Sequence, residues 1–311
     1  MRAVIALGGN AMTARDGSAR PDDQRLAVEL AMRHVATIVA SGHQVVLTHG
    51  NGPQVGNLLV KNELAAAVVP PVPLDWCGAQ TQATIGALVL NALGRELTGR
   101  GVASRVAVLV SRTLVDADDP GFAQPSKPIG RYLPRAEAAV MIEHGQLWED
   151  RGERGWRRVV ASPQPRECLD QDAALALLEA GFVVACAGGG GIPVVRDGAG
   201  GYRGIEAVID KDLTAALLAN SLHADALVIA TDVDVVVLGW GTPEARPLGA
   251  VSVAELRDHA ARGEFASGSM APKVEAACRF AESGRGFAVI ASLEHIEEAL
   301  AGTSGTTVTK E

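Results

Sequence analysis

Apolar, β-branched segments alternate with amphipathic segments along almost the whole chain of 311 residues. The apolar segments are continuous rather than interrupted at every second residue, which is typical of strands buried on both faces of a parallel sheet. Because helices usually connect parallel strands, we expect an α/β fold: one domain over residues 1–311, a three-layer αβα sandwich around a mainly parallel sheet. The predicted strands are Arg2–Leu7, Gln44–Thr48, Ser104–Val110, Val159–Ser162, Phe182–Ala187, Ala226–Thr231, Val235–Leu238, Phe287–Ala291 and Thr306–Thr309. The predicted helices are Asp22–Ala40, Pro53–Ala66, Trp76–Thr98, Asp170–Ala180, Asp210–Ser221, Val253–Ala261, Met270–Glu282 and Leu293–Ala301.

One region, between Asp116 and Arg158, interrupts this alternation. Pro and Gly residues recur through its first part, and its last part, Trp148–Arg158, is hydrophilic. A structureless loop of this length is uncommon inside a domain, so we expect residues 116–158 to form a small protruding subdomain. The glycine-rich segment Asp197–Gly204 is predicted to be the tip of a hairpin.

The net charge of the chain disfavours nucleic acids and anionic membranes as binding partners. The chain has 28 Lys and Arg residues against 36 Asp and Glu residues, a net charge of −8, and only 4 % aromatic residues. It therefore lacks the basic face and stacking side chains that nucleic-acid binding needs, and it does not suit an anionic membrane surface. No apolar stretch approaches the roughly 20 residues that span a bilayer. The four cysteines lie far apart without a C-x-x-C pair, so we expect free thiols in a cytoplasmic protein.

Three glycine-rich turns follow predicted strands, at Gly8-Gly9-Asn10, Gly50-Asn51-Gly52 and Gly188–Pro193. Ligands of open parallel sheets bind beyond the carboxyl ends of the strands, where these turns lie. A single glycine pair is most often only a tight turn. Three in equivalent places favour an anion site, because glycine lets backbone N–H groups approach a ligand closely. Pro53 suits the first position of a helix whose positive end would face the anion.

Two lysines stand where a cation is unfavourable. Lys211 is at the predicted start of one helix and Lys273 is near the start of another. Each opposes the helix dipole, at a cost of about 0.3–1 kcal/mol when exposed. Either alone could be a solvated lysine, but together they suggest an anion that cancels the cost. Lys127 lies in a loop stiffened by Pro125 and Pro128. Lysines and glycine amides that converge on one cleft are typical of a phosphoryl-transfer site, which needs positioned positive donors.

Acidic residues accompany these lysines. Asp212 follows Lys211 directly and could orient the ammonium groups. Asp210 could contact a ligand or simply cap the helix. The segment Thr231–Asp234 closes a predicted strand, where a turn and a nucleotide contact are equally compatible with the pattern.

Several other kinds of site are excluded or disfavoured. No G-x-x-x-x-G-K-[ST] motif is present, which excludes a P-loop, and the glycines after Gly50 do not match a dinucleotide-binding fingerprint. No H-x-x-x-H or paired Cys/His spacing occurs, so we expect no metal site built by protein ligands alone. The G-x-S-x-G elbow of hydrolases is also missing. Cys77 is more typical of a buried packing group than of a nucleophile.

Short motifs in a recognisable order are spread over the whole chain. They are Ala6–Asn10, Thr48–Gly56, Leu74-Asp75 with Cys77–Ala79, Thr113–Asp116, Lys127–Gly130, Val160–Pro163, Gly188–Val194, Glu206–Leu213, Thr231–Asp234, and Gly268–Met270 with Pro272–Ala276. In number, order and spacing they resemble the carbamate kinases, a family of the amino acid kinase superfamily. The resemblance implies the fold of that superfamily, with a small protruding subdomain.

The resemblance also implies reversible phosphoryl transfer between ATP and carbamate in the presence of Mg²⁺. Lys211 and Lys273 would contact the transferring phosphate, Asp212 would hold the lysines, and Lys127 would reach the carbamate or carbamoyl phosphate from the subdomain. Mg²⁺ would be bound through phosphate oxygens. A homodimer is implied as well, together with ATP production from carbamoyl phosphate in arginine or related catabolism.

The substrates would be divided between two parts of the chain. Residues 1–200 would hold mainly carbamate or carbamoyl phosphate, and residues 201–311 mainly the nucleotide. The residues implied for the small substrate and the phosphate are Gly8, Gly9, Asn10, Gly50, Asn51 and Gly52. Those implied for the nucleotide are Asp210, Thr231, Asp232, Asp234, Ser269 and Met270.

Two other functions are compatible with the same fold. An enzyme that phosphorylates a different small carboxylate would need a larger substrate pocket, whereas the Lys127 motif and the inserted subdomain favour carbamate. A catalytically silent nucleotide-binding regulator would be expected to lack one of the lysines or Asp212, and all of them are present.

Overall fold

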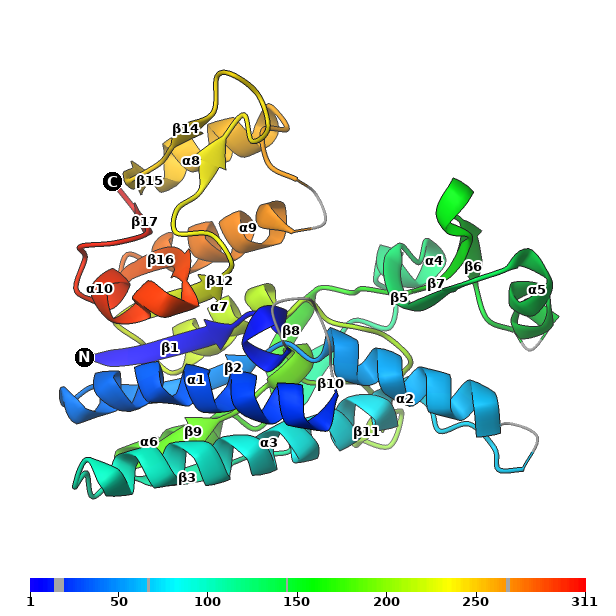
Figure 1. Ribbon diagram of the computed structural model, residues 1–311, viewed down its shortest axis with the longest axis horizontal. Coiled ribbons are helices and arrows are strands. Elements are labelled where there is room, and N and C mark those ends of the chain that lie inside the picture. Colours follow the sequence, from blue (N-terminus) through cyan, green and yellow to red (C-terminus); the bar gives the residue numbers. More distant parts are fainter. Residues whose placement is uncertain (14–19, 66–67, 144, 267–268) are drawn as a thin grey trace.

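A large sheet forms the centre of the computed structural model, which describes residues 1–13, 20–65, 68–143, 145–266 and 269–311 (Figure 1). Its eight strands are β1 (Arg2–Leu7), β2 (Gln44–His49), β3 (Arg105–Val108), β9 (Phe182–Ala185), β12 (Ala226–Thr231), β15 (Ala250–Ser252), β16 (Phe287–Ser292) and β17 (Thr306–Thr309). The order across the sheet is β15-β17-β16-β12-β1-β2-β9-β3, and each neighbouring pair is parallel except β16 with β17. The mainly parallel sheet expected from the sequence is therefore confirmed.

Helices cover both faces of this sheet, as expected for an αβα sandwich. One face packs against α1 (Pro21–Ala40), α3 (Leu74–Gly99) and α10 (Ile296–Leu300). The other packs against α6 (Gln171–Glu179), α7 (Lys211–Ser221), α8 (Val253–Ala261) and α9 (Met270–Ala281). Helix α1 begins with Pro21, whose missing N–H costs nothing at this position, and buries Val28, Met32 and Val35 at helical spacing. The three layers are thus held together by two hydrophobic cores, one on each face.

The structure contains a second, smaller sheet that the sequence does not predict. Its strands are β4 (Arg112–Val115), β8 (Pro165–Cys168), β10 (Ile192–Arg196) and β11 (Tyr202–Gly204), in the order β11-β10-β4-β8. Strands of three to five residues carry too little periodicity to be recognised in a sequence. The hairpin predicted at Asp197–Gly204 is confirmed: β10 ends at Arg196 and pairs antiparallel with β11, which forms the last three residues of that segment.

The interruption predicted at residues 116–158 contains a protruding three-stranded sheet (Figure 1). The strands of this sheet are β5 (Lys127–Leu133), β6 (Trp148–Asp150) and β7 (Trp156–Val160). The same region contains the helices α4 (Pro120–Ala123) and α5 (Arg135–Glu143) and the short 3-10 helix η2 (Gly152–Arg154). Leu133, Ala138 and Trp148 form a small hydrophobic cluster within it.

Two predicted strands need correction. The prediction of a separate strand at Val159–Ser162 is wrong, because Lys127 pairs with Val160 and so draws this segment into β7 of the protruding sheet. The strand predicted at Val235–Leu238 shortens to β13 (Val237–Leu238), which pairs with β14 (Arg246–Pro247) and not with the large sheet. In both places the apolar residues are packed in the protein but do not pair with strands of the large sheet.

The four cysteines are free thiols and all are buried. Burial raises the pKa of Cys77, and it raises the pKa of both Cys186 and Cys278 to about 11. These thiols therefore stay protonated near neutral pH, which suits packing groups. None of the helices in the described ranges combines the length and the apolarity needed to cross a bilayer.

Candidate active site

A cavity of about 910 Å³ opens at the carboxyl ends of β1, β2 and β12. Gly8 follows β1, Gly50 to Gly52 follow β2, and the first residues of α7 and α9 complete the wall. The predicted lysines Lys127, Lys211 and Lys273 all line this one cavity. The convergence of cations and glycine turns expected from the sequence is therefore confirmed.

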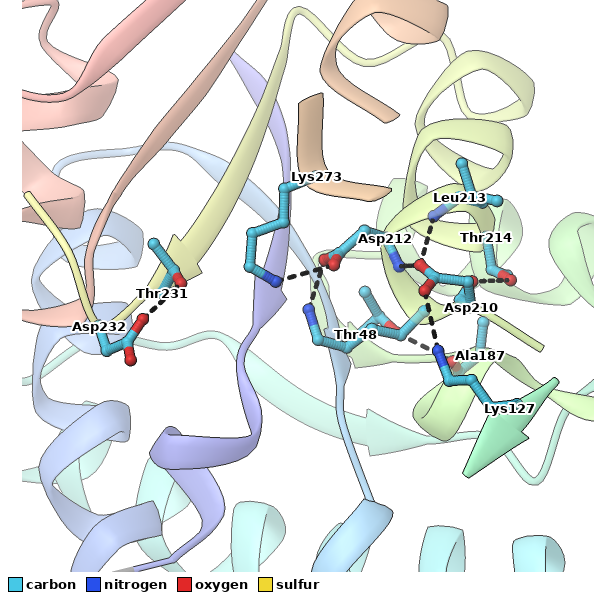
Figure 2. Close-up of polar contacts among 11 residues, drawn as sticks. Thr48, Lys127, Ala187, Asp210, Asp212, Leu213, Thr214, Thr231, Asp232 and Lys273 are labelled. Carbon is cyan, nitrogen blue, oxygen red and sulfur yellow. Dashed lines mark hydrogen bonds and ion pairs between the residues drawn. The ribbon is translucent and has the colours of Figure 1, made fainter. Parts of the chain in front are cut away.

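Asp210 fixes the first turn of α7 and binds Lys127 with the same carboxylate. Its Oδ1 accepts hydrogen bonds from the backbone N–H groups of Asp212 at 2.9 Å and of Leu213 at 3.4 Å, the geometry of an N-cap. Its Oδ2 accepts a hydrogen bond from Lys127 Nζ at 3.2 Å (Figure 2). The capping role that the sequence allowed is confirmed. The second oxygen also ties the protruding sheet to α7.

Asp212 lies between two ammonium groups (Figure 2). Its Oδ1 accepts a hydrogen bond from Lys211, and its Oδ2 accepts one from Lys273 Nζ at 2.9 Å. The Asp212 side chain is 5 % exposed, and the side chains of Lys211 and Lys273 are 13 % and 14 % exposed. A buried cluster of two cations and one anion carries one surplus positive charge, which an anionic ligand would neutralise.

The pKa values follow from this crowding. Burial alone would raise the pKa of Asp212, but the charges of Lys211 and Lys273 and their hydrogen bonds outweigh it and hold that pKa below its usual value. Burial lowers the pKa of Lys211, and the charge of Lys273 lowers it further, while Asp212 opposes both effects. The two buried ammonium groups therefore repel each other, and Asp212 compensates only part of that repulsion. A negatively charged phosphoryl group bound there would compensate the rest.

Glycine allows two close approaches in the cavity wall. A Cβ on Gly8 would lie 2.9 Å from the carbonyl oxygen of Ala230, so β1 and β12 could not meet here with a larger residue. Gly189 has a φ of +68° within the 3-10 helix η3 (Gly188–Gly190), and a Cβ there would lie 2.1 Å from Asn51 Nδ2. The third glycine-rich turn thus presses directly against the second.

The other predicted phosphate residues lie in the same place. Gly8, Gly9, Gly50, Asn51 and Gly52 all line the cavity. Asn10 belongs to the 3-10 helix η1 (Gly9–Met12), but its side chain lies outside the part of the structure that is described.

The predicted nucleotide residues lie mostly across the cavity from Lys127. Thr231, Asp232, Asp234 and Ser269 line it there, whereas Asp210, the N-cap of α7, lines it beside Lys127. Figure 2 shows Thr231 and Asp232 on the far side of Lys273, where Thr231 Oγ1 donates to Asp232 Oδ1 at 3.0 Å. Met270 packs against one of the two main cores and does not line the cavity. Gly268, part of the same motif, lies outside the described residues.

Sequence reasoning missed a further part of the wall. Side chains from α1 and from the segment around η4 (Leu293–His295) close the cavity on a side for which no motif was recognised. Only tertiary packing brings these elements together, so the sequence offered no local signal for them. They are Asp23, Leu26, Ala27, Leu30, Ser292, Leu293 and Glu294.

His49, at the end of β2, is predicted to make the protein sensitive to acid. Its side chain is buried, its Nδ1–H donates to the carbonyl oxygen of Gly50 at 3.0 Å, and burial lowers its pKa to about 4. The unfolded chain takes up this proton near pH 6.5 and the folded chain only near pH 4, so the unfolded state binds more protons between these values. We therefore expect the free energy of unfolding to fall by about 3 kcal/mol from pH 7 to pH 4 because of this group alone.

The measurement is urea unfolding at several pH values. Asparagine can make the same hydrogen bond without titrating, so the His49→Asn variant should lose this part of the pH dependence. Equal slopes in the variant and the parent protein would assign the acid sensitivity to other groups.

The sequence and the fold both have known relatives. Residues 1–292 match the model of the amino acid kinase family. The carbamate kinase of Thermococcus kodakarensis is 44 % identical over 100 % of this chain and 99 % of its own, and carbamate kinase 1 of Enterococcus faecium is 42 % identical over 99 % and 98 %. A carbamate kinase structure from Giardia lamblia bound to AMP-PNP superimposes with a TM-score of 0.94 and 38 % identity, covering 100 % of this chain and 98 % of that one. The chain therefore belongs to the amino acid kinase family and, within it, to the carbamate kinases.

Proposed function

We propose that the protein transfers a phosphoryl group reversibly between ATP and carbamate, giving ADP and carbamoyl phosphate. In the forward direction a carbamate oxygen attacks the γ-phosphorus, the bond from that phosphorus to the bridging oxygen breaks, and the electron pair stays on ADP. The observation that carries the proposal is the pair of lysines on Asp212, in a cavity lined with glycine turns. Such a transfer requires little from the protein beyond position and positive charge.

Lys211 and Lys273 are the groups proposed to stabilise the transferring phosphoryl group. Both ammonium groups are fixed by a single buried carboxylate, so they need not reorganise as negative charge develops. Asp212 acts as the positioning residue of the pair.

Lys127 is proposed to bind the carbamate portion. It enters the cavity from the protruding sheet and is held opposite α7 by Asp210. Apart from Gly50, whose N–H donates to the carbonyl oxygen of Leu7 at 3.0 Å, the glycine turns after β1 and β2 would supply backbone N–H donors to the small substrate and the phosphate, with Asn51 beside them. Residues 1–200 then carry mainly the carbamate side.

Residues 201–311 are proposed to carry mainly the nucleotide, through Thr231, Asp232, Asp234 and Ser269. For Mg²⁺, the nearby carboxylates Asp210 and Asp212 are suitable hard oxygen donors, but both already bind ammonium groups. The metal would therefore be held mainly by phosphate oxygens and would supply neutralisation of the phosphate charge. The cytoplasmic location, the homodimer and the role in arginine catabolism stay predictions from the sequence.

A coupled assay tests the activity directly. ATP formation is measured from ADP and carbamoyl phosphate. In the reverse direction, ADP formation from ATP is compared with carbamate, acetylglutamate and aspartate as acceptors. The proposal predicts activity with carbamoyl phosphate and with carbamate, and little with the other two. Preference for acetylglutamate or aspartate would instead identify a different carboxylate kinase on the same fold.

Replacing Lys127 by Ala should weaken the use of carbamoyl phosphate much more than the binding of ADP. The Asp210→Asn variant is a matched companion, because Asn retains the helix cap but loses the charge that holds Lys127. Both variants should raise the KM for carbamoyl phosphate, while calorimetric titration of the Lys127→Ala protein with ADP should give a nearly unchanged Kd. An equal loss of both substrates would indicate that Lys127 has only a structural role.

A further inference from the structure

The Asn51 side chain is nearly buried, and contacts with the protein interior hold its amide group in place. Asn51 stands between β2 and α2 (Gly52–Ala65), lines the cavity, and is 9 % exposed. Its Nδ2 donates a hydrogen bond to Thr81 Oγ1 at 2.9 Å, and Thr81, on α3, is 2 % exposed. The backbone of Gly189 also packs closely against this amide, because a Cβ there would lie 2.1 Å from Nδ2, 2.5 Å from Cγ and 2.6 Å from Oδ1 of Asn51. The amide plane therefore has little room to move.

The Thr81 hydroxyl determines which end of the amide faces it. A hydroxyl has one proton, and that of Thr81 is donated to the carbonyl oxygen of Gly78 at 2.7 Å. Thr81 Oγ1 can then only accept a hydrogen bond, and only the Nδ2 end of Asn51 can donate one. If the amide were reversed, Oδ1 would face Thr81 and the hydroxyl proton would have to be donated to it. Thr81 Oγ1 and the carbonyl oxygen of Gly78, which are 2.7 Å apart, would then have no proton between them. Nδ2 is thus fixed toward Thr81 and Oδ1 away from it.

Asn51 Oδ1 remains available to a ligand. Across the described ranges, the amide makes one side-chain hydrogen bond, the one from Nδ2 to Thr81. The backbone carbonyl of Asn51 accepts from Val55 N–H at 2.9 Å, so Asn51 stands where a helix-capping side chain usually binds the first turn. Here the side-chain oxygen is not used in that way. It is a hydrogen-bond acceptor in the part of the cavity wall that the glycine turns also line.

A hydrogen-bond acceptor in this position can recognise an amino group on the substrate, which the lysines cannot. Carbamoyl phosphate and acetyl phosphate share the phosphate and the acyl oxygen, and they differ in an amino group against a methyl group. Ammonium groups and backbone N–H groups bind the shared parts equally. An amide oxygen distinguishes the two, because N–H donates a hydrogen bond and C–H does not.

We propose that Asn51 Oδ1 accepts a hydrogen bond from the amino group of carbamate or carbamoyl phosphate, and that Thr81 determines this specificity by fixing the Asn51 amide. Thr81 is a positioning residue, since it acts through Asn51. The inference rests on the proposed function and adds the residue pair that selects the acceptor.

The test compares kcat/KM for carbamoyl phosphate with kcat/KM for acetyl phosphate, with ADP as the phosphoryl acceptor. Thr81→Val keeps the shape of the side chain and removes the hydroxyl, so nothing selects which end of the amide faces position 81. The two ends can then exchange within the same plane, which turns Nδ2 toward the cavity. This variant should lower the ratio of the two constants by about tenfold. Thr81→Ser restores the hydroxyl and should keep the wild-type ratio. A merely structural role would lower both constants together and leave the ratio unchanged.

Asn51→Ala removes the acceptor and should lower the ratio at least as far. The double variant, Thr81→Val with Asn51→Ala, should be no less selective than Asn51→Ala alone, because Thr81 acts only through Asn51. Melting temperature and ADP binding report folding, and Thr81→Ala replaces the Val variant if that one does not fold. An unchanged ratio in Asn51→Ala overturns the inference, and an unchanged ratio in Thr81→Val alone overturns the role of Thr81. Wild-type protein without activity toward carbamoyl phosphate would instead contradict the proposed function.

Discussion

Replacing Lys211 or Lys273 by Met should lower kcat for ATP synthesis by about 10²–10³-fold, the usual effect of removing one preorganised donor to a developing charge. Methionine preserves most of the side-chain volume, so the loss reports the ammonium group and not a cavity. The two lysines share Asp212, and each variant leaves the other lysine paired with it. Steady-state kinetics with saturating ADP and carbamoyl phosphate provides the measurement.

Lys61→Met is the matched control, because Lys61 is exposed on α2 and does not line the cavity. It should keep the parent kcat. A Lys211→Met or Lys273→Met protein with wild-type turnover would remove that lysine from the transfer step. Loss of ADP binding without loss of turnover at saturation would assign it to nucleotide affinity instead.

Asp212→Asn should destabilise the ligand-free protein by about 3–5 kcal/mol, because it leaves two buried ammonium groups without a counter-charge. The pKa of Asp212 is held below its usual value by those same lysines, so the carboxylate is charged over the whole neutral range. Urea unfolding at pH 7 without ligand measures the change. Turnover should fall as well, since the lysines lose the group that fixes them.

Two further variants separate charge from shape. Adding Lys273→Met to Asp212→Asn removes one of the unpaired cations and should restore part of the lost stability. Asp210→Asn, two residues earlier, keeps the helix cap and should cost much less. If Asp212→Asn proved as stable as Asp210→Asn, the ammonium pair would not depend on the carboxylate.

The convergence of the three lysines could be predicted because Lys211 and Lys273 violate a local rule. A cation at a helix N-terminus is unfavourable in isolation, so its presence in the sequence indicates a partner from elsewhere. The structure brings Lys273 from another helix onto Asp212, the neighbour of Lys211 in sequence, and places Lys127 on Asp210. The position of the central strands was predictable for a related reason: a continuous apolar run leaves few alternatives to burial on both faces.

Other features could not be predicted because they exist only after folding. The contribution of Leu26 and Leu30 to the cavity depends on how α1 packs beside η4. The Thr81–Asn51 hydrogen bond joins residues 30 apart in sequence, and neither belongs to a pattern that indicates the other. Val159 was assigned to the wrong sheet, since its apolar character fits either sheet equally and only the pairing of β5 with β7 decides.

The protruding sheet has a hydrophobic cluster of its own in Leu133, Ala138 and Trp148, separate from the cores that hold the large sheet. It meets the rest of the molecule at its base, through Ile129 and Val160, and at the tip of Lys127. The protruding sheet thus has a hydrophobic cluster separate from the two cores of the large sheet. Substitutions within that cluster can therefore shift the position of Lys127 while leaving the packing of both main cores unchanged.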